Sequence, residues 1–127
     1  MKVHQEVLEV GTRGRGLVDL SSRVEAVVAA SGVRTGLATL FIQHTSASLL
    51  IQENADPSVP EDATAYEHDD EGIDDMPAHL RSAMTHTSEV IPVTGGRLGL
   101  GTWQAIYLWE HRRAPHTRRV IVHVQGV

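Results

Sequence analysis

Hydrophobic and polar positions alternate along most of this chain, a pattern that predicts β-strands. Six segments carry it: residues 3–10, 35–43, 47–53, 89–93, 98–110 and 118–124. Glycines interrupt the pattern within residues 98–110. About three residues around Thr45 separate the second and third of these segments, which predicts a hairpin or a sharp bend there. We therefore expect a core of about six strands.

Helical spacing of apolar residues appears in a few shorter segments. Residues 17–30 form the clearest one and are followed by Gly32, a typical helix C-terminal stop. Further short helices are expected after Asp56-Pro57 and over residues 76–84, where Pro77 suits a first helical turn. No linker or internal repeat divides the chain. These elements predict one α+β domain over residues 1–127, with a compact sandwich-like core and two or three short helices.

The segment from Phe41 to Pro57 places polar side chains between apolar runs. His44, Ser46 and Ser48 lie between two segments that are expected to be buried. A buried imidazole or hydroxyl without a partner costs about 1–3 kcal/mol, so these residues predict either a hydrogen-bonded network or a functional site. A serine nucleophile beside His44 is the less favoured interpretation, because no Gly-x-Ser-x-Gly elbow is present.

Composition narrows the classes of protein that fit. The chain has 127 residues, eight histidines and no cysteine, so a metal would need His, carboxylate or water ligands. It has no pattern typical of a signal peptide and no apolar run of membrane-spanning length. With the absence of cysteine, this predicts a cytoplasmic protein that does not enter a membrane.

Charge is distributed unevenly along the chain, whose net formal charge is −5. Ten of the sixteen acidic residues lie between Glu53 and Asp75, where there is no Lys or Arg. Such a run is typical of a solvated loop or helix face, and part of it could also line a cation site. The arginines predict a patch for an anion such as phosphate, made by Arg97, Arg112, Arg113, Arg118 and Arg119. The acidic balance and the few aromatic residues argue against nucleic acid as a partner.

Five motifs in order carry a family resemblance: residues 44–49, 53–57, 68–72, 75–79, and 101–104 continuing to 110–112. Together they closely resemble the YjbQ-like family, whose members are often labelled secondary thiamine-phosphate synthases. The resemblance covers nearly the whole chain. It implies a compact α+β subunit that assembles as a homotrimer, with a site where subunits meet.

The resemblance also implies roles for individual residues. It marks Glu53, Asp56, His79 and Glu110 as catalytic, Ser46, Asn54, Thr102, Trp103 and Gln104 as substrate-binding, and His44, His68 and His79 as metal ligands. Three imidazoles would suit zinc or another transition metal, whereas magnesium would need the carboxylates. The alternative is that the histidines are structural residues that only form hydrogen bonds.

The family label implies a transferase that joins hydroxymethylpyrimidine diphosphate to a thiazole phosphate and releases pyrophosphate. The chain has no Gly-rich phosphate-binding loop, so we expect this to be a weak or side activity. Two alternatives remain open. One is a trimer that binds a metal or a small phosphorylated metabolite without catalysis, and the other is a metal-dependent hydrolase.

Overall fold

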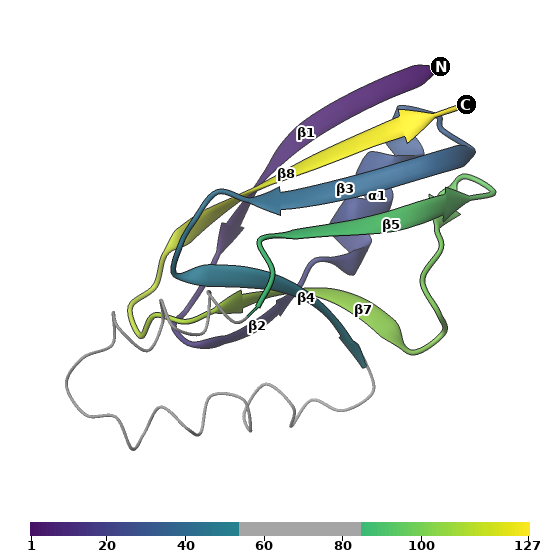
Figure 1. The fold of residues 1–127 in the computed structure, drawn as a ribbon. Coiled ribbons are helices and arrows are strands. Elements are labelled where there is room, and N and C mark those ends of the chain that lie inside the picture. Colours follow the sequence, from purple (N-terminus) through teal and green to yellow (C-terminus); the bar gives the residue numbers. More distant parts are fainter. Residues whose placement is uncertain (54–84) are drawn as a thin grey trace.

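The computed structural model describes residues 1–53 and 85–127, which form two antiparallel sheets and one helix (Figure 1). The elements follow in the order β1 (Lys2–Gly11), β2 (Gly16–Asp19), α1 (Ser21–Ser31), β3 (Thr35–Ile42), β4 (Ala47–Glu53), β5 (Ser88–Thr94), β6 (Arg97–Leu98), β7 (Gln104–Glu110) and β8 (Thr117–Gly126). The expected α+β class is confirmed, and the described residues are mostly β with one helix.

Two sheets of different size make up the core. Sheet A has five strands in the order β1-β8-β3-β5-β6, and sheet B has three in the order β2-β7-β4. The helix α1 lies behind sheet A in Figure 1, and it contacts strands of both sheets. The two chain ends lie side by side, because β1 and β8 pair along their whole length.

The alternation in the sequence explains where the core lies. One face of sheet A is apolar and buried, and its side chains pack with α1 and with sheet B. The core includes Leu8, Val10, Val24, Val27, Val28, Leu40, Ile42, Leu49, Ile91, Ile106, Leu108, Val120, Val122 and Val124. Each such side chain contributes roughly 1.5–3 kcal/mol when it is removed from water.

The helix starts later than the sequence pattern predicts. Leu17 and Val18 have apolar side chains that suit either structure, but they belong to β2 and pair with β7. The helix ends as expected, with Gly32 in the left-handed conformation at φ 70°. The other expected helices lie outside the described residues. Within residues 1–53 and 85–127, no helix is long and apolar enough to cross a membrane.

The structure decides between the hairpin and the sharp bend that were expected around Thr45. Because β3 and β4 belong to different sheets, residues 43–46 form a bend between the sheets. A second strand prediction needs correction. The segment expected over residues 98–110 is divided into β6 and β7. Between them, Gly101 N–H donates to Oε1 of Gln104 at 2.8 Å and closes a tight turn. The described residues thus contain eight strands where about six were expected.

A close approach of two strands generates the first testable prediction. Gly36 of β3 lies opposite Gly126 of β8, and a Cβ added at Gly36 would lie 2.0 Å from the carbonyl oxygen of Gln125. We expect Gly36→Ala to lower the free energy of unfolding by about 1–3 kcal/mol, because the backbone must shift. Urea unfolding measures this change.

Gly11 provides the matched control, since a Cβ there would meet no atom within 4 Å. Gly11→Ala should change stability by less than about 0.5 kcal/mol. Equal effects of the two substitutions would contradict the close approach of β3 and β8.

Candidate functional site

A buried ion pair joins the two sheets at one end of the molecule. Glu110 ends β7 of sheet B and is fully buried, while Arg118 lies near the start of β8 of sheet A and is 4% exposed. The guanidinium of Arg118 donates through Nε to Oε1 of Glu110 at 2.7 Å and through Nη2 to Oε2. This is the bidentate geometry that makes Arg–carboxylate pairs strong and directional.

Further donors complete the environment of Glu110. The hydroxyl of Thr12 donates to Oε1 at 2.7 Å, and the backbone N–H of Arg112 donates to Oε2 at 3.2 Å. Burial alone would raise the pKa of Glu110, but the hydrogen bonds from Arg118, Thr12 and Arg112 outweigh it and lower the pKa overall. The carboxylate is therefore ionised, and both of its oxygens are occupied.

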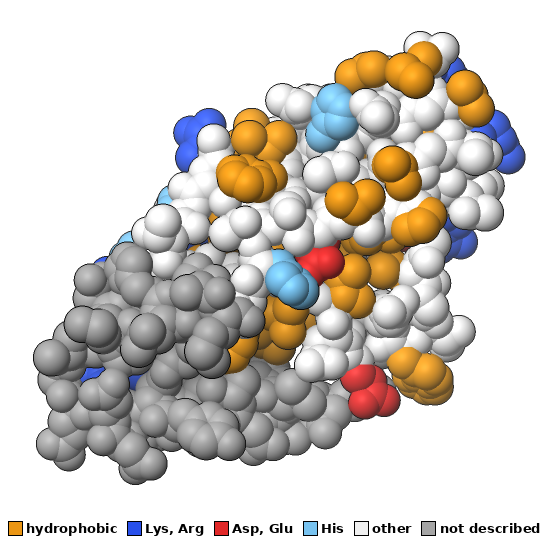
Figure 2. All heavy atoms as spheres, in the orientation of Figure 1, with side chains coloured by type: hydrophobic (Ala, Val, Ile, Leu, Met, Phe, Trp, Pro, Cys, Tyr) orange, Lys and Arg blue, Asp and Glu red, His pale blue; other side chains and the backbone are white. Residues whose placement is uncertain are grey.

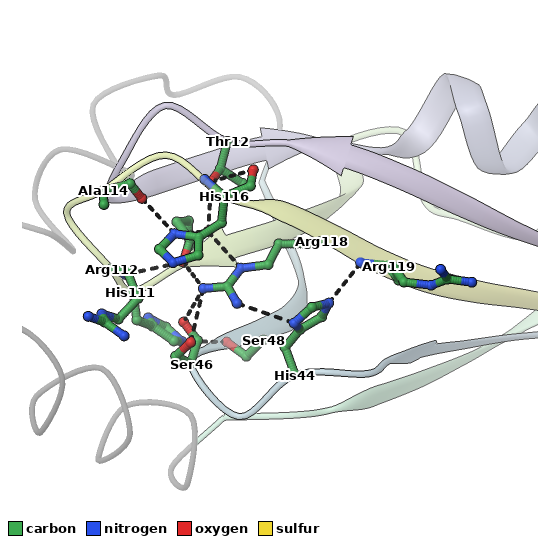
Figure 3. A network of polar contacts seen from close by, with 11 residues as sticks. Thr12, His44, Ser46, Ser48, His111, Arg112, Ala114, His116, Arg118 and Arg119 are labelled. Carbon is green, nitrogen blue, oxygen red and sulfur yellow. Dashed lines mark hydrogen bonds and ion pairs between the residues drawn. The ribbon is translucent and has the colours of Figure 1, made fainter.

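Arg118 also holds the bend between the sheets (Figure 3). Its Nη2 donates to the hydroxyl of Ser46 at 3.0 Å and to the carbonyl of Ser46 at 3.3 Å. Its Nη1 lies 3.3 Å from Nδ1 of His44. We refer to these residues as the Glu110 network, which consists of Thr12, His44, Ser46, Glu110 and Arg118.

The imidazole of His44 is held in a defined orientation. Its Nε2 accepts the backbone N–H of Arg119 at 2.9 Å, and turning the ring over would place a carbon there. Burial, followed by the charge of Arg118, lowers the pKa of His44, so the ring is neutral near pH 7. A neutral imidazole has one proton, which must then lie on Nδ1. Nδ1–H and the guanidinium of Arg118 are both donors, and they face each other.

This arrangement bears on the expected metal ligands. The lone pair of His44 at Nε2 is used by Arg119 N–H, and Nδ1 faces a cationic guanidinium. In this orientation His44 does not fit as a ligand of a divalent metal. The other two expected ligands, His68 and His79, lie outside the described residues. Within those residues, no group of three His, Asp or Glu side chains is placed to hold a metal.

A second polar contact lies beside the network. The hydroxyl of Ser48 is 2.9 Å from Nε2 of His111, and both residues are fully buried. The ring of Trp109 packs against His111 at a centroid distance of 4.7 Å. Glu110 and His111 have different partners, as alternation along a strand predicts. Ser48 is a buried hydrogen-bonding residue and is not exposed as a nucleophile would be.

Several expected substrate-binding residues lie at the other end of sheet B. Thr102, Trp103 and Gln104 are exposed around the turn before β7, and Glu53 of β4 pairs with Gln104. Ala47 pairs with Glu110 at the opposite end of the same two strands. Six residues of strand separate the two ends, which is about 20 Å. One subunit therefore does not bring these residues together with Ser46 and Glu110. Asn54 and Asp56 lie outside the described residues.

The expected arginine patch is also divided. Arg118 is buried in the ion pair, and Arg97 lies in β6, at the end of sheet A remote from the Glu110 network. Arg112, Arg113 and Arg119 are close to the network in the chain and are at least partly exposed.

Sequence reasoning missed two members of this region. Thr12 was not selected, because nothing local marks a threonine whose partner is 98 positions away. His116 lies outside the five motifs, yet its Nδ1 is 3.8 Å from Oε1 of Glu110. The signal that could have found Thr12 is its position directly after Gly11, at the end of the first predicted strand.

The fold and site define a class of small β-rich domain in which a buried carboxylate–guanidinium pair joins two sheets. Residues 6–127 match the family described as UPF0047 protein YjbQ-like, and the chain belongs to this family. The resemblance seen in the motifs is thereby confirmed.

Individual relatives cover nearly the full chain. It is 58% identical to a UPF0047 protein of Synechocystis, over 97% of this chain and 92% of that protein. It is 42% identical to UPF0047 protein YjbQ of Escherichia coli O157:H7, over 97% and 98% of the two chains. A crystal structure of a YbjQ-like protein from Sulfolobus solfataricus superposes with a TM-score of 0.86 at 29% identity, covering 99% of each chain.

The ion pair generates a stability prediction. Arg118→Met leaves the Glu110 carboxylate buried without its counter-ion, which should lower the free energy of unfolding by about 3–5 kcal/mol. The double variant Glu110→Leu/Arg118→Met should be more stable than Arg118→Met alone, because no charge remains unpaired. Chemical unfolding of the three proteins measures both effects.

Arg119→Met, the adjacent and exposed position, is the control and should cost less than about 0.5 kcal/mol. A double variant that is less stable than Arg118→Met would contradict this account, because the unpaired carboxylate would then not be the group that destabilises the fold.

The lowered pKa of Glu110 gives a pH dependence. Its folded pKa lies below the ordinary value of 4.5, so its stabilisation is complete above that pH and is lost as the pH falls through the folded pKa. Unfolding measured between pH 7 and pH 2 should show a steep acid loss in wild type. Glu110→Gln should flatten that loss, whereas Glu9→Gln, at an exposed carboxylate, should retain it. The same acid slope in all three proteins would argue against this pKa assignment.

Proposed function

We propose that this protein binds a small phosphorylated metabolite at the Glu110 network. Formation of thiamine phosphate from hydroxymethylpyrimidine diphosphate and a thiazole phosphate would be a weak or side activity of that site. In this reaction the methylene carbon of the pyrimidine forms a bond to the thiazole nitrogen. Its bond to the diphosphate oxygen breaks, and pyrophosphate leaves.

One observation carries the proposal, and it is the bond from the backbone N–H of Arg119 to Nε2 of His44. With the His44 proton then on Nδ1, two donors meet without an acceptor between them. Nδ1–H of His44 and Nη1 of Arg118 lie 3.3 Å apart, and no described residue offers an oxygen to Nη1. Two converging donors are poorly arranged on their own, and an oxygen that accepts from both relieves the conflict. A phosphate oxygen is suited to this position, because hydrogen bonds to a charged acceptor are roughly twice as strong as neutral ones.

The surrounding charge supports an anion over a neutral acceptor. The charge of Arg118 is matched by Glu110, while the nearby Arg119 is exposed and its charge reaches His44. This cation favours a ligand that brings negative charge, so a phosphate is preferred to water or an amide.

The positions of the other expected site residues support assembly of the chain into an oligomer. The exposed group Glu53, Thr102, Trp103 and Gln104 is about 20 Å from the Glu110 network within one subunit. A homotrimer with a site at each subunit boundary would allow the group of one subunit to complete the network of the next. Trp103, at 62% exposed, would then be the residue that covers the ligand.

Binding without catalysis is the second candidate function. It is favoured because the Glu110 carboxylate already accepts several hydrogen bonds within the protein. Glu110 accepts from Arg118, Thr12 and Arg112 and is not available as a base or a metal ligand. The hydroxyl of Ser46 is likewise engaged by Arg118. Any proton transfer would therefore depend on other residues, whereas binding needs only the donors described above.

Pyrophosphate is the probe that tests the site. In calorimetric titration of wild type we expect saturable binding of pyrophosphate, weakened at least about 10-fold in His44→Leu, since a hydrogen bond to a charged group contributes about 1.5–3 kcal/mol. His86→Leu is the control, because His86 bonds Glu89 on the surface. The same samples, given both thiamine precursors, report thiamine phosphate by chromatography.

The outcomes separate the two candidates. Pyrophosphate binding that depends on His44, with no thiamine phosphate formed, favours the binding protein. Turnover that His44→Leu abolishes favours the transferase. Equal affinity of wild type and His44→Leu, or no binding by wild type, contradicts the proposed site.

A further inference from the structure

His116, in the loop that leads into β8, is held beside the Glu110 network. Its backbone N–H donates to the hydroxyl of Thr12 at 3.0 Å, and its carbonyl oxygen accepts from the backbone N–H of Thr12 at 2.8 Å. The same hydroxyl donates to Glu110 at 2.7 Å. Thr12 therefore holds the backbone of His116 and also completes the environment of the buried carboxylate (Figure 3). The side chain of His116 stays 31% exposed.

The two nitrogens of the His116 ring have different roles. Nδ1 lies 2.7 Å from the carbonyl oxygen of Ala114, and a carbonyl only accepts, so Nδ1 carries a proton. A neutral imidazole has one proton, so Nε2 then has a lone pair. Among residues 1–53 and 85–127, no group forms a hydrogen bond with Nε2. Nε2 is therefore the atom that takes up a proton as the pH falls, and no existing hydrogen bond has to break.

Charged groups lie on the elements packed around His116. Nδ1 is 3.8 Å from Oε1 of Glu110, and the charge of Glu110 is matched by that of Arg118. Because these two groups neutralise each other, a charge gained at His116 is not cancelled within the ion pair. The charged and titratable groups on the end of β7, on β8, on the bend before β4 and on the two adjoining loops are Glu110, Arg118, His44, Arg13, Arg15, Arg112 and Arg113.

The charge of His116 reaches the donors of the proposed anion site. The pKa of His44 is lowered by burial first, then by the charge of Arg118, and the charge of His116 lowers it further. A positive charge on His116 thus acts at the ring of His44, whose Nδ1 is one of the two donors proposed to hold the anion. A charge that disfavours a proton at this position favours a phosphate there.

We propose that protonation of His116 strengthens anion binding at the Glu110 network, so that affinity rises as the pH falls from 8 to 6. This rests on the proposed function, because the anion and its site are the same. His116 acts through its charge and is not a catalytic residue. For two unit charges roughly 8 Å apart near a protein surface, Coulomb's law corresponds to a change in affinity of about 3-fold or more.

Inorganic sulfate is the probe that tests this, because its charge is constant between pH 6 and pH 8, whereas pyrophosphate gains protons in that range. The backbone N–H of Arg119, which donates to His44, reports binding in ¹H–¹⁵N nuclear magnetic resonance titrations at constant ionic strength. Wild type should bind sulfate at least about 3-fold more tightly at pH 6 than at pH 8. His116→Gln should bind with the same affinity at both pH values.

His86→Gln is the matched control. Figure 2 shows, among the coloured side chains, a histidine beside an acidic group near the centre of that face. His86 makes such a contact, with Nδ1 3.0 Å from Oε1 of Glu89, and its side chain is 71% exposed. Because His86 bonds Glu89 and no member of the Glu110 network, His86→Gln should keep the wild-type dependence of affinity on pH.

A second measurement needs no variant. Binding and protonation are linked reciprocally, so saturating sulfate should raise the pH at which the wild-type His116 ring titrates. A 3-fold change in affinity corresponds to a rise of about 0.5 pH unit. Long-range ¹H–¹⁵N spectra of the histidine side chains follow this titration. A residue that only shapes its loop would titrate at the same pH with and without sulfate.

The outcomes separate this inference from the proposed function. Sulfate binding that His44→Leu weakens, but that depends on pH equally in wild type and His116→Gln, overturns the role of His116 and leaves the anion site intact. An unchanged titration of His116 in saturating sulfate overturns it as well. Wild type that binds no sulfate, or that binds it as tightly as His44→Leu does, contradicts the anion site itself, and the role of His116 falls with it.

Discussion

The ion pair between Glu110 and Arg118 is the interaction on which this end of the molecule depends. It joins the last residue of β7 in sheet B to β8 in sheet A, where both side chains are buried. Two charges in such a position are stable only when almost every donor and acceptor is used. Thr12 and the backbone N–H of Arg112 donate the other hydrogen bonds to the Glu110 carboxylate, and Ser46 accepts from Nη2 of Arg118. The pair therefore determines how the bend between β3 and β4 lies.

The chemistry of His44 follows from that arrangement. Burial and then the charge of Arg118 lower the pKa of the ring and keep it neutral, and the backbone N–H of Arg119 directs its proton toward Arg118. A histidine held this way is a hydrogen-bond donor for an anion more than a ligand for a cation. The same contacts that hold the two sheets together thus orient the donors of the proposed site. Structure and binding are difficult to separate by mutation at Arg118, which is why His44 is the better residue to vary.

Much of the fold could be predicted from the sequence, because alternation of apolar residues locates strands directly. The start of α1 could not, since Leu17 and Val18 suit a helix and a strand equally, and only pairing with β7 decides between them. His44 and Ser46 could be selected as polar residues between buried segments. The burial of Arg118 could not be predicted, because its partner Glu110 lies in another sheet and the topology alone brings them together. For the same reason, motifs that suggested one site occupy two ends of sheet B.

The most direct test of this account is the protonation of His44 in solution, observed by long-range ¹H–¹⁵N nuclear magnetic resonance of the histidine side chains. We predict a neutral ring at pH 7 with the proton on Nδ1 and an unprotonated Nε2 that accepts from Arg119. Added pyrophosphate should shift the Nδ1 resonance and leave the tautomer unchanged. A ring protonated on Nε2 would mean that the bond from Arg119 does not form. The convergence of donors at Arg118, and with it the proposed anion site, would then be wrong.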